Sequence, residues 1–281
     1  MTGLSNLPRK VWSACNYDEM KLLATVLGKW GGPSSQKRPV LVDVGAHYGS
    51  SCSPFLENGW EVVAFEPDAS NRSHLERLAD RFPTRLRVIP KAVSAESGLA
   101  SFYASSTSTG ISSLHSFHDS HEELGLIETV PLRVALEEQG VTDIDLLKID
   151  VEGHEMTALR SMDWSNRPKV VVCEFDETKA VADGPSHKSV RNHLETVGYE
   201  HIATSEWFPV VEYGQHHRPR RLSSSASEVQ TNAWGNVVAF ADHASMEKFI
   251  ESGTPLITRS RRTQPLTKHA SSVVRAMRRL G

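Results

Sequence analysis

Short runs rich in valine, isoleucine and leucine alternate with helical segments in this chain of 281 residues. The apolar runs cover residues 39–45, 60–67, 85–93, 144–152 and 169–177. Segments with helical spacing lie between or beside them, at residues 71–81, 132–139 and 154–162. Strands this continuously apolar are buried on both faces, and intervening helices supply the crossovers of a parallel sheet. The alternation therefore predicts an α/β fold, with a mostly parallel, Rossmann-like sheet and helices on both faces.

Changes in composition divide the chain into three parts. Residues 1–38 hold a helical segment, DEMKLLATVLGKW, and a linker, GGPSSQKRP; residues 39–250 form the main domain. Within it we expect a hairpin-like segment at 98–105, a polar connection to residue 125, and a polar, basic loop at 216–229. Residues 251–281 carry seven lysines and arginines against Glu251. This predicts a flexible basic tail, able at most to associate weakly with an anionic surface.

Composition excludes several classes of protein. With 39% hydrophobic and 23% charged residues and a net charge of −3, the chain is globular and gives no reason to expect a nucleic-acid partner. Cys15, Cys52 and Cys173 form no CxxC pair, which argues against a disulfide framework or a zinc knuckle. No signal-peptide core and no run of about 18 apolar residues is found. We therefore expect a cytoplasmic protein without a membrane span.

The run LVDVGAHYG, residues 41–49, ends a predicted strand on an acid and a glycine-rich turn. Gly45 and Gly49 suit a turn that brings backbone close to a nucleotide-like ligand. The missing glycine at His47 departs from the dinucleotide fingerprint, and Asp43 would repel a pyrophosphate but attract a cation. The motif therefore favours S-adenosylmethionine, whose sulfonium is positively charged. The alternative is a plain buried strand with Asp43 capping the next helix.

A second acid follows at the end of the next predicted strand. Glu66 lies 21 residues after Gly45, near the spacing of about 20 at which an acid receives ribose hydroxyls in this architecture. A carboxylate can accept both hydroxyls of an unphosphorylated ribose. Two acids at neighbouring strand ends favour a binding site over a purely structural turn.

The run LLKIDVEGHE places three charged residues at alternate positions. Lys148, Asp150 and Glu152 are expected on one side of the strand end, before Gly153 opens a helix. We expect Asp150 nearest the reacting atoms, as a general base or an anchor for an acceptor hydroxyl, with Lys148 and Glu152 orienting it. His154 has a suitable pKa for a base and is the other candidate. The structural alternative is an ion pair that stabilises the strand end.

Together, LVDVGAHYG, AFEPDASN, IPKAVSAESG, TGISSL and above all DLLKIDVEGHE resemble the FkbM family of S-adenosylmethionine-dependent methyltransferases, over residues 39–177. The resemblance implies a class I methyltransferase fold, with a seven-stranded sheet whose last strand is antiparallel. It implies methylation of a hydroxyl on a saccharide, glycolipid or related natural product. It also places the loop around Lys91, Ala92 and Val93 near the adenine. The expected cofactor-binding residues are Asp43, Gly45, Ala46, Gly49, Glu66, Pro67, Ala92 and Asp150.

Several points stay open at this level. Asp150 and Glu152 could hold a divalent metal, which we leave unassigned. His115, His118 and His121 recur every third residue, as a zinc site or as incidental loop residues. Ser112 and Ser113, in TGISSL, are candidate acceptor or cofactor contacts.

Aromatic residues also recur late in the main domain. Trp207, Phe208, Tyr213 and Trp234 either stack on a sugar or belong to the core. The competing functions are a non-catalytic S-adenosylmethionine-binding module and a nicotinamide-dependent oxidoreductase. The sequence does not identify the acceptor, the general base or the oligomeric state.

Overall fold

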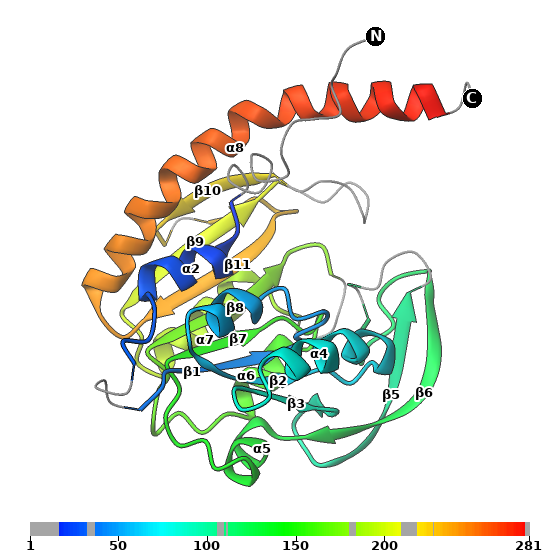
Figure 1. The fold of residues 1–281 in the computed structure, drawn as a ribbon, viewed down its shortest axis with the longest axis vertical. Helices are drawn as coiled ribbons and strands as arrows, with labels where there is room; N and C mark the ends of the chain where they lie inside the picture. The colour runs from blue at the N-terminus through cyan, green and yellow to red at the C-terminus, as the bar shows by residue number, and fades with distance from the viewer. Residues whose placement is uncertain are drawn as a thin grey trace.

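The structure is a computed structural model in which residues 17–32, 37–105, 110, 112–179, 184–208, 218–226 and 228–278 are described, with backbone alone from residue 261 onward. Eight strands form the main sheet in the order β10–β9–β11–β8–β7–β1–β2–β3 (Figure 1). Their bounds are β1 (Val40–Val44), β2 (Glu61–Phe65), β3 (Leu86–Ile89), β7 (Leu146–Ile149), β8 (Val170–Asp176), β9 (His201–Trp207), β10 (Pro219–Ser223) and β11 (Trp234–Phe240).

The direction of the strands confirms the predicted fold class. β3, β2, β1, β7 and β8 run parallel, and β11 is inserted antiparallel between β8 and β9. The last strand in the chain is thus antiparallel, as the resemblance implied. The sheet has one strand more than the seven expected, because β10 adds an edge strand to β9.

β10 lies inside the segment that we expected to be a polar loop. Its arginines explain why it forms a strand. Glu206 on β9 is fully buried, and it is neutralised by Arg220 Nη1 at 2.7 Å and Arg221 Nη2 at 2.9 Å. A buried carboxylate is costly without such partners. The paired charges therefore fix a segment whose own sequence contains little that is apolar.

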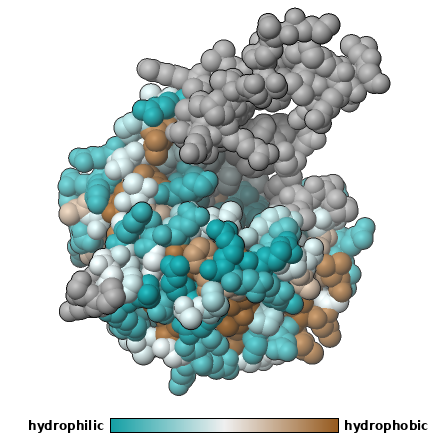
Figure 2. Space-filling model, in the orientation of Figure 1, coloured by the Kyte–Doolittle hydropathy of each residue, from teal (hydrophilic) through white to brown (hydrophobic). Residues whose placement is uncertain are grey.

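A second, three-stranded sheet has the order β4–β6–β5. Its strands are β4 (Ala92–Val93), β5 (Gly98–Ser105) and β6 (His121–Val130). β5 confirms the predicted hairpin segment, whereas β6 starts within the expected polar connection. The outer face of this ribbon exposes Leu99, Leu124 and Leu126. Figure 2 shows hydrophobic side chains on the side of the molecule where β5 and β6 lie in Figure 1.

Helices cover the main sheet on both faces, each over a separate apolar core. One core contains residues of α5 (Leu132–Glu138), α6 (Glu155–Arg160) and α7 (His187–Thr196). The other contains residues of α2 (Glu19–Leu27), α3 (Ser53–Glu57), α4 (Ala69–Arg81) and α8 (His243–Arg278). Asp18, Asp68 and Ser186 accept hydrogen bonds from backbone N–H groups in the first turns of α2, α4 and α7, which explains where these helices begin.

α8 is a packed helix in part of the segment for which the sequence predicts a flexible tail. It begins at His243, before the expected tail boundary at residue 251, and lies along α2 and β10 (Figure 1). Ile257 and Ser260 are buried, and Ser260 Oγ accepts a hydrogen bond of 3.0 Å from the backbone N–H of Tyr17. Residues 251–260 are therefore helical, with packed positions, rather than a free tail. The basic side chains from Arg261 onward lie outside the described residues, and no described helix is long and apolar enough to cross a membrane.

Candidate active site

A cavity of about 350 Å³ opens at the carboxyl ends of β1, β2 and β7. This is the edge at which open α/β sheets bind ligands. Most of the predicted cofactor-binding and catalytic residues line it: Gly45, Ala46, Glu66, Pro67, Ala92, Lys148, Asp150, Glu152 and His154. Asp43 and Gly49 do not line it. Most of the residues predicted from the sequence therefore line one cavity. Asp43 and Gly49, which were also assigned to the site, lie outside its lining.

The two glycines of the first turn are required by the protein itself. Both adopt positive φ angles, 83° at Gly45 and 80° at Gly49. A Cβ on Gly45 would lie 1.8 Å from the backbone oxygen of Asp150, and a Cβ on Gly49 would lie 2.8 Å from Leu75 on α4. Glycine at these positions thus lets the turn pack against β7 and α4. The expected reason, close approach to a ligand, is not needed to explain either residue.

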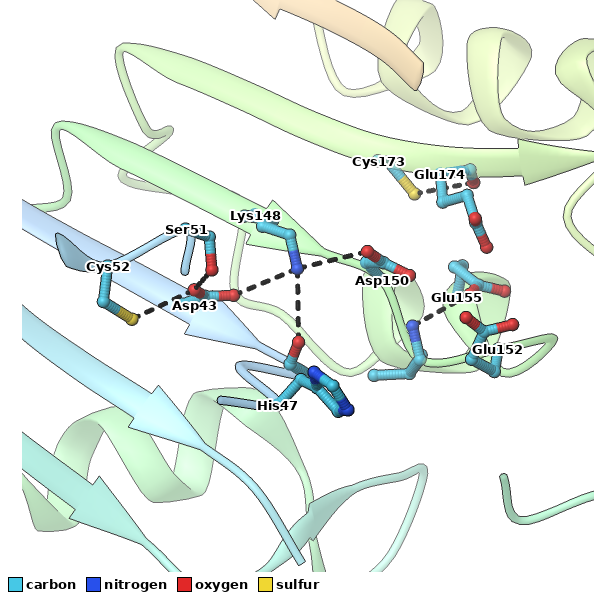
Figure 3. Close-up of polar contacts among 12 residues, drawn as sticks. Asp43, His47, Ser51, Cys52, Lys148, Asp150, Glu152, Glu155, Cys173 and Glu174 are labelled. Carbon is cyan, nitrogen blue, oxygen red and sulfur yellow. Dashed lines mark hydrogen bonds and ion pairs between the residues drawn. The ribbon is translucent and has the colours of Figure 1, made fainter. Parts of the chain in front are cut away.

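Asp43 is the clearest difference from the sequence-based expectation. Its side chain is fully buried, and its carboxylate contacts Lys148 Nζ at 3.2 Å, Cys52 Sγ at 3.2 Å and the hydroxyl of Ser51 (Figure 3). The charge of Asp43 is therefore balanced within the protein. We had expected it to attract the sulfonium directly; in the structure it instead holds Lys148 in place.

Glu66 occupies the position predicted for a ribose-binding acid. It is 5% exposed and lies at the end of β2, where Oε2 accepts the N–H of His47 at 2.7 Å and Oε1 accepts the N–H of Asp68 at 3.0 Å. The side chain of Asn71 also hydrogen-bonds Glu66, and since a carboxylate has about four acceptor positions, one remains for a ribose hydroxyl. Burial raises the pKa of Glu66 to about 7, although these two N–H groups lower it.

The raised pKa of Glu66 predicts opposite effects of pH on binding and on stability. Because the ionised form accepts ribose hydroxyls best, cofactor affinity should rise as pH increases from about 6 to about 8, around the pKa of Glu66. Folding favours the protonated form, so the contribution of Glu66 to stability is present below about pH 4.5 and is lost as pH rises through about 7.

Glu66→Gln should accordingly bind S-adenosylhomocysteine about 10- to 100-fold more weakly, with a flat pH profile. Above pH 7 it should also lose the pH-dependent destabilisation of the wild type. Isothermal titration calorimetry and urea unfolding at several pH values measure the two effects. A wild-type affinity that does not change over this range would contradict the role given to Glu66.

Lys148 lies between Asp43 and Asp150 (Figure 3) and lines the cavity. Its Nζ is 3.2 Å from Asp43 Oδ1 and 3.3 Å from Asp150 Oδ2. Burial alone would lower the pKa of Lys148, but the carboxylates of Asp150 and Asp43 outweigh burial and raise it. The side chain of Asp150 is 34% exposed and faces the cavity. Asp150 is thus a carboxylate held by a permanent cation and open to a ligand.

Glu152 does not lie with Lys148 and Asp150 on one side of the strand end, as the sequence predicts. Its φ of 56° breaks the alternation of the strand, and its carboxylate pairs with Lys179 Nζ at 2.8 Å. Burial, opposed by Lys179, raises the pKa of Glu152. Glu152 therefore belongs to a second charged group, centred on Lys179, and of the two residues expected to orient Asp150 it is Lys148 that pairs with it.

Sequence reasoning missed the group around Lys179. This buried lysine also contacts Glu174 at 2.6 Å and Asp176 at 3.8 Å. Among the described residues, Asp150, Glu155 and Glu174 bring carboxylate oxygens within 4.8 Å of one another, whereas Asp150 and Glu152 were the expected metal ligands. Glu155 accepts the N–H groups of Val151 and Gly153, and Glu174 is bound to Lys179. Glu155 and Glu174 thus already accept hydrogen bonds from donors within the protein, and no metal is assigned to this group.

His154 forms a pair with His115. Nδ1 of His154 is 2.9 Å from Nε2 of His115, and Nε2 of His154 is 3.1 Å from Ser94 Oγ. Burial, with a smaller effect of His115, lowers the pKa of His154 to about 4, so the ring is neutral at pH 7. Because both ring nitrogens already have partners, the arrangement favours Asp150 over His154 as the base.

Among the described residues, His115, His118 and His121 do not come together as metal ligands, so the alternative of incidental loop residues stands. His118 Nδ1 is 2.7 Å from Ser120 Oγ, and His121 starts strand β6 rather than continuing a helix. The loop itself returns to the site, because the hydroxyl of Ser113 donates to the carbonyl oxygen of Glu152 at 2.7 Å. Ser112 lines the cavity directly. Lys91 and Val93 also line it, on either side of Ala92.

Comparison with known proteins agrees with this geometry. Residues 43–201 match the Methyltransferase FkbM domain. The fold and the site define the class of S-adenosylmethionine-dependent methyltransferases. Within that class, the chain belongs to the FkbM methyltransferase family. No curated protein matches the sequence.

Solved structures give more distant similarities. The methyltransferase FkbM of Methylobacillus flagellatus is 15% identical, with a TM-score of 0.44; the match covers 82% of this chain and 50% of that one. This chain therefore spans about half of that protein. The precorrin-6Y C5,15-methyltransferase of Geobacter metallireducens is 13% identical, with a TM-score of 0.41 and coverage of 86% and 94%. The 1,6-didemethyltoxoflavin-N1-methyltransferase of Burkholderia thailandensis, solved with S-adenosylhomocysteine, is 15% identical, with a TM-score of 0.41 and coverage of 83% and 81%.

Proposed function

We propose that the protein transfers the methyl group of S-adenosylmethionine to a hydroxyl oxygen of a saccharide or related natural product. The observation that carries this proposal is the position of Asp150, a partly exposed carboxylate on the floor of the cavity, held by Lys148 at 3.3 Å. Family membership supports methyl transfer over the alternative of a nicotinamide-dependent oxidoreductase. The oxygen acceptor rests on the carboxylate and on the resemblance of the sequence motifs.

The lining of the cavity fits a cofactor of this kind. Glu66 would hold the ribose, the backbone of Gly45–His47 would border the amino-acid part, and Lys91–Val93 would border the adenine. Five carboxyl groups but only two lysines line the described part of the cavity, which suits a ligand that carries a sulfonium. When bound, S-adenosylmethionine supplies an electrophilic methyl group.

The residues of the chain position the acceptor hydroxyl and supply a group that can accept its proton. Asp150 receives the proton of the acceptor hydroxyl, or anchors that hydroxyl, at the edge of the cavity. Lys148 holds the carboxylate of Asp150 in position, and Asp43 holds Lys148. A positioned base contributes about 10²- to 10⁴-fold to such reactions, and alignment of the reactants supplies much of the rest.

The test is to incubate the purified protein with radiolabelled S-adenosylmethionine and a panel of glycans, glycolipids and small hydroxylated metabolites. We expect label in at least one saccharide, at a position resistant to the mild base that cleaves methyl esters. Cofactor binding without transfer to any acceptor would instead favour a non-catalytic binding module. Transfer to a nitrogen acceptor would exclude the oxygen chemistry while leaving the methyltransferase class intact.

A further inference from the structure

The cavity extends beyond the residues assigned to the cofactor. Its far end is bordered by Asp18, Glu19 and Met20 at the start of α2, by Val172 on β8 and by Asn236 on β11. α2 was not among the elements expected to form the site, and of β11 only Trp234 was a candidate sugar contact. Asp150 lies between this end and the end that contains Glu66, so a ligand at the far end has access to the carboxylate.

Strand register explains why polar groups gather there. Asn236 on β11 is paired with Glu174 on β8 and with Ser205 on β9. Ile149 is paired with Cys173, so Asp150 follows at the level of Glu174. A row of polar side chains therefore crosses four neighbouring strands at one level of the sheet. Neighbouring strands are about 4.8 Å apart, which places Asn236 roughly 10 Å from Asp150.

Two groups at the far end have unused hydrogen-bonding capacity. The side chain of Asn236 has no partner among the described residues, so its amide offers two donors and an acceptor. Glu19 is 7% exposed, and its Oε1 accepts both the indole N–H of Trp207, at 2.7 Å, and the hydroxyl of Ser205. Its Oε2 receives no hydrogen bond from another described residue. Burial raises the pKa of Glu19, which favours a carboxyl that can donate.

Two tryptophans, Trp207 and Trp234, lie next to this row of polar side chains. At the following level of the sheet, Trp234 is paired with Asp176 and with Trp207. The two indole rings are stacked, with centroids 5.3 Å apart. The indole N–H groups are already used, by Glu19 and by the carbonyl of Phe208. The pair therefore serves as a rigid support for the far end. Tyr213, another of the aromatic candidates, lies outside the described residues.

The charges at the site restrict what can bind. Asp18, Glu19, Glu66, Asp150 and Glu152 line the cavity. Of the two lining lysines, Lys148 is already balanced by Asp43 and Asp150. Lys91 is 3.6 Å from Glu128. A phosphate or carboxylate on the acceptor would therefore lie among acidic side chains, and both lysines in the described part of the lining already have carboxylate partners.

We propose that the far end of the cavity is the acceptor subsite, that it takes an uncharged, polyhydroxylated ring, and that Asn236 and Glu19 bind its hydroxyls. The inference rests on the proposed function, since it assigns the acceptor of that reaction. It selects neutral saccharides from the broader class and excludes sugar phosphates. Asn236 is then a specificity-determining residue that touches the acceptor without taking part in proton transfer.

The experiment measures acceptor binding separately from cofactor binding. Methyl hexopyranosides of the gluco, manno and galacto series, and glucose 6-phosphate, serve as probes in saturation-transfer-difference NMR with the S-adenosylhomocysteine complex. Asn236→Leu removes the amide, and Asn236→Ala is the second variant should leucine disturb the fold. Asn232→Leu is the matched control, because Asn232 is exposed and lies outside the cavity lining.

We expect at least one neutral glycoside to bind the wild type, and to bind both Asn236 variants about tenfold more weakly, as for the loss of one or two hydrogen bonds. Affinity for S-adenosylhomocysteine should not change. Unaltered glycoside binding by both variants would overturn the subsite and leave the proposed function standing. Binding of glucose 6-phosphate as tight as that of the glycosides, or no glycoside binding by a wild type that binds S-adenosylhomocysteine, would overturn the neutral acceptor. A wild type that does not bind S-adenosylhomocysteine would contradict the proposed function itself.

Discussion

Asp150→Asn is expected to lower the rate of methyl transfer by about 10²- to 10⁴-fold while S-adenosylhomocysteine still binds. The amide has the size of the carboxylate and can still be held near Lys148, 3.3 Å away, but it cannot accept a proton. Steady-state kinetics distinguishes the two roles open to Asp150. A base loses kcat at unchanged KM, whereas an anchor for the acceptor hydroxyl loses affinity as well.

A matched substitution on the same strand controls for the loss of an acid. Asp145 lies at the opposite end of β7, where it pairs with Lys169 at 2.7 Å, and it does not line the cavity. Asp145→Asn should therefore leave turnover unchanged. If Asp150→Asn kept more than a tenth of wild-type activity, the base would have to be sought elsewhere, with His154 as the next candidate.

Lys148→Met is expected to lower the free energy of unfolding by about 3–5 kcal/mol, because it leaves a buried carboxylate without its cation. Asp43 is 0% exposed, and the hydroxyl of Ser51 and the thiol of Cys52 are then its remaining side-chain partners. Urea unfolding followed by circular dichroism measures the loss.

A double variant separates charge from shape. Lys148→Met combined with Asp43→Asn removes both charges, and it should recover a large part of the lost stability, since a pair replaced as a whole is far less costly than a broken one. If the single and the double variant were equally unstable, loss of methylene packing rather than the unpaired charge would explain the effect. Neither variant is expected to turn over, because Asp150 loses its contact with Lys148.

The central part of the fold could be predicted because its strands are buried on both faces. Runs such as VLVDV and VVVCEFD contain little that suits any other environment, so their apolar content alone indicates buried strands. The edge of the sheet carries no such signal. β10 depends on the pairing of two arginines with Glu206 on another strand, and α8 depends on contacts with α2, near the other end of the chain. Contacts between distant segments leave no periodic pattern in the sequence.

The site was predictable where backbone position decides it. Glu66 and Asp150 follow directly from the ends of β2 and β7, and strand ends are visible in the sequence. Whether an acid faces a ligand or another side chain is not visible, so Asp43 was assigned to the cofactor. Lys179, Asn236 and Glu19 were missed for the same reason. Asn236 reaches the site through strand register, Glu19 through α2 and Lys179 through its ion pair with Glu152, and no local motif marks them.

The hydrogen bond between Tyr17 and Ser260 joins residues that are 243 positions apart in the chain. During synthesis on a ribosome, α2 therefore emerges long before the segment that holds it. The wall that Asp18, Glu19 and Met20 give the cavity lacks this support until that later segment has been made.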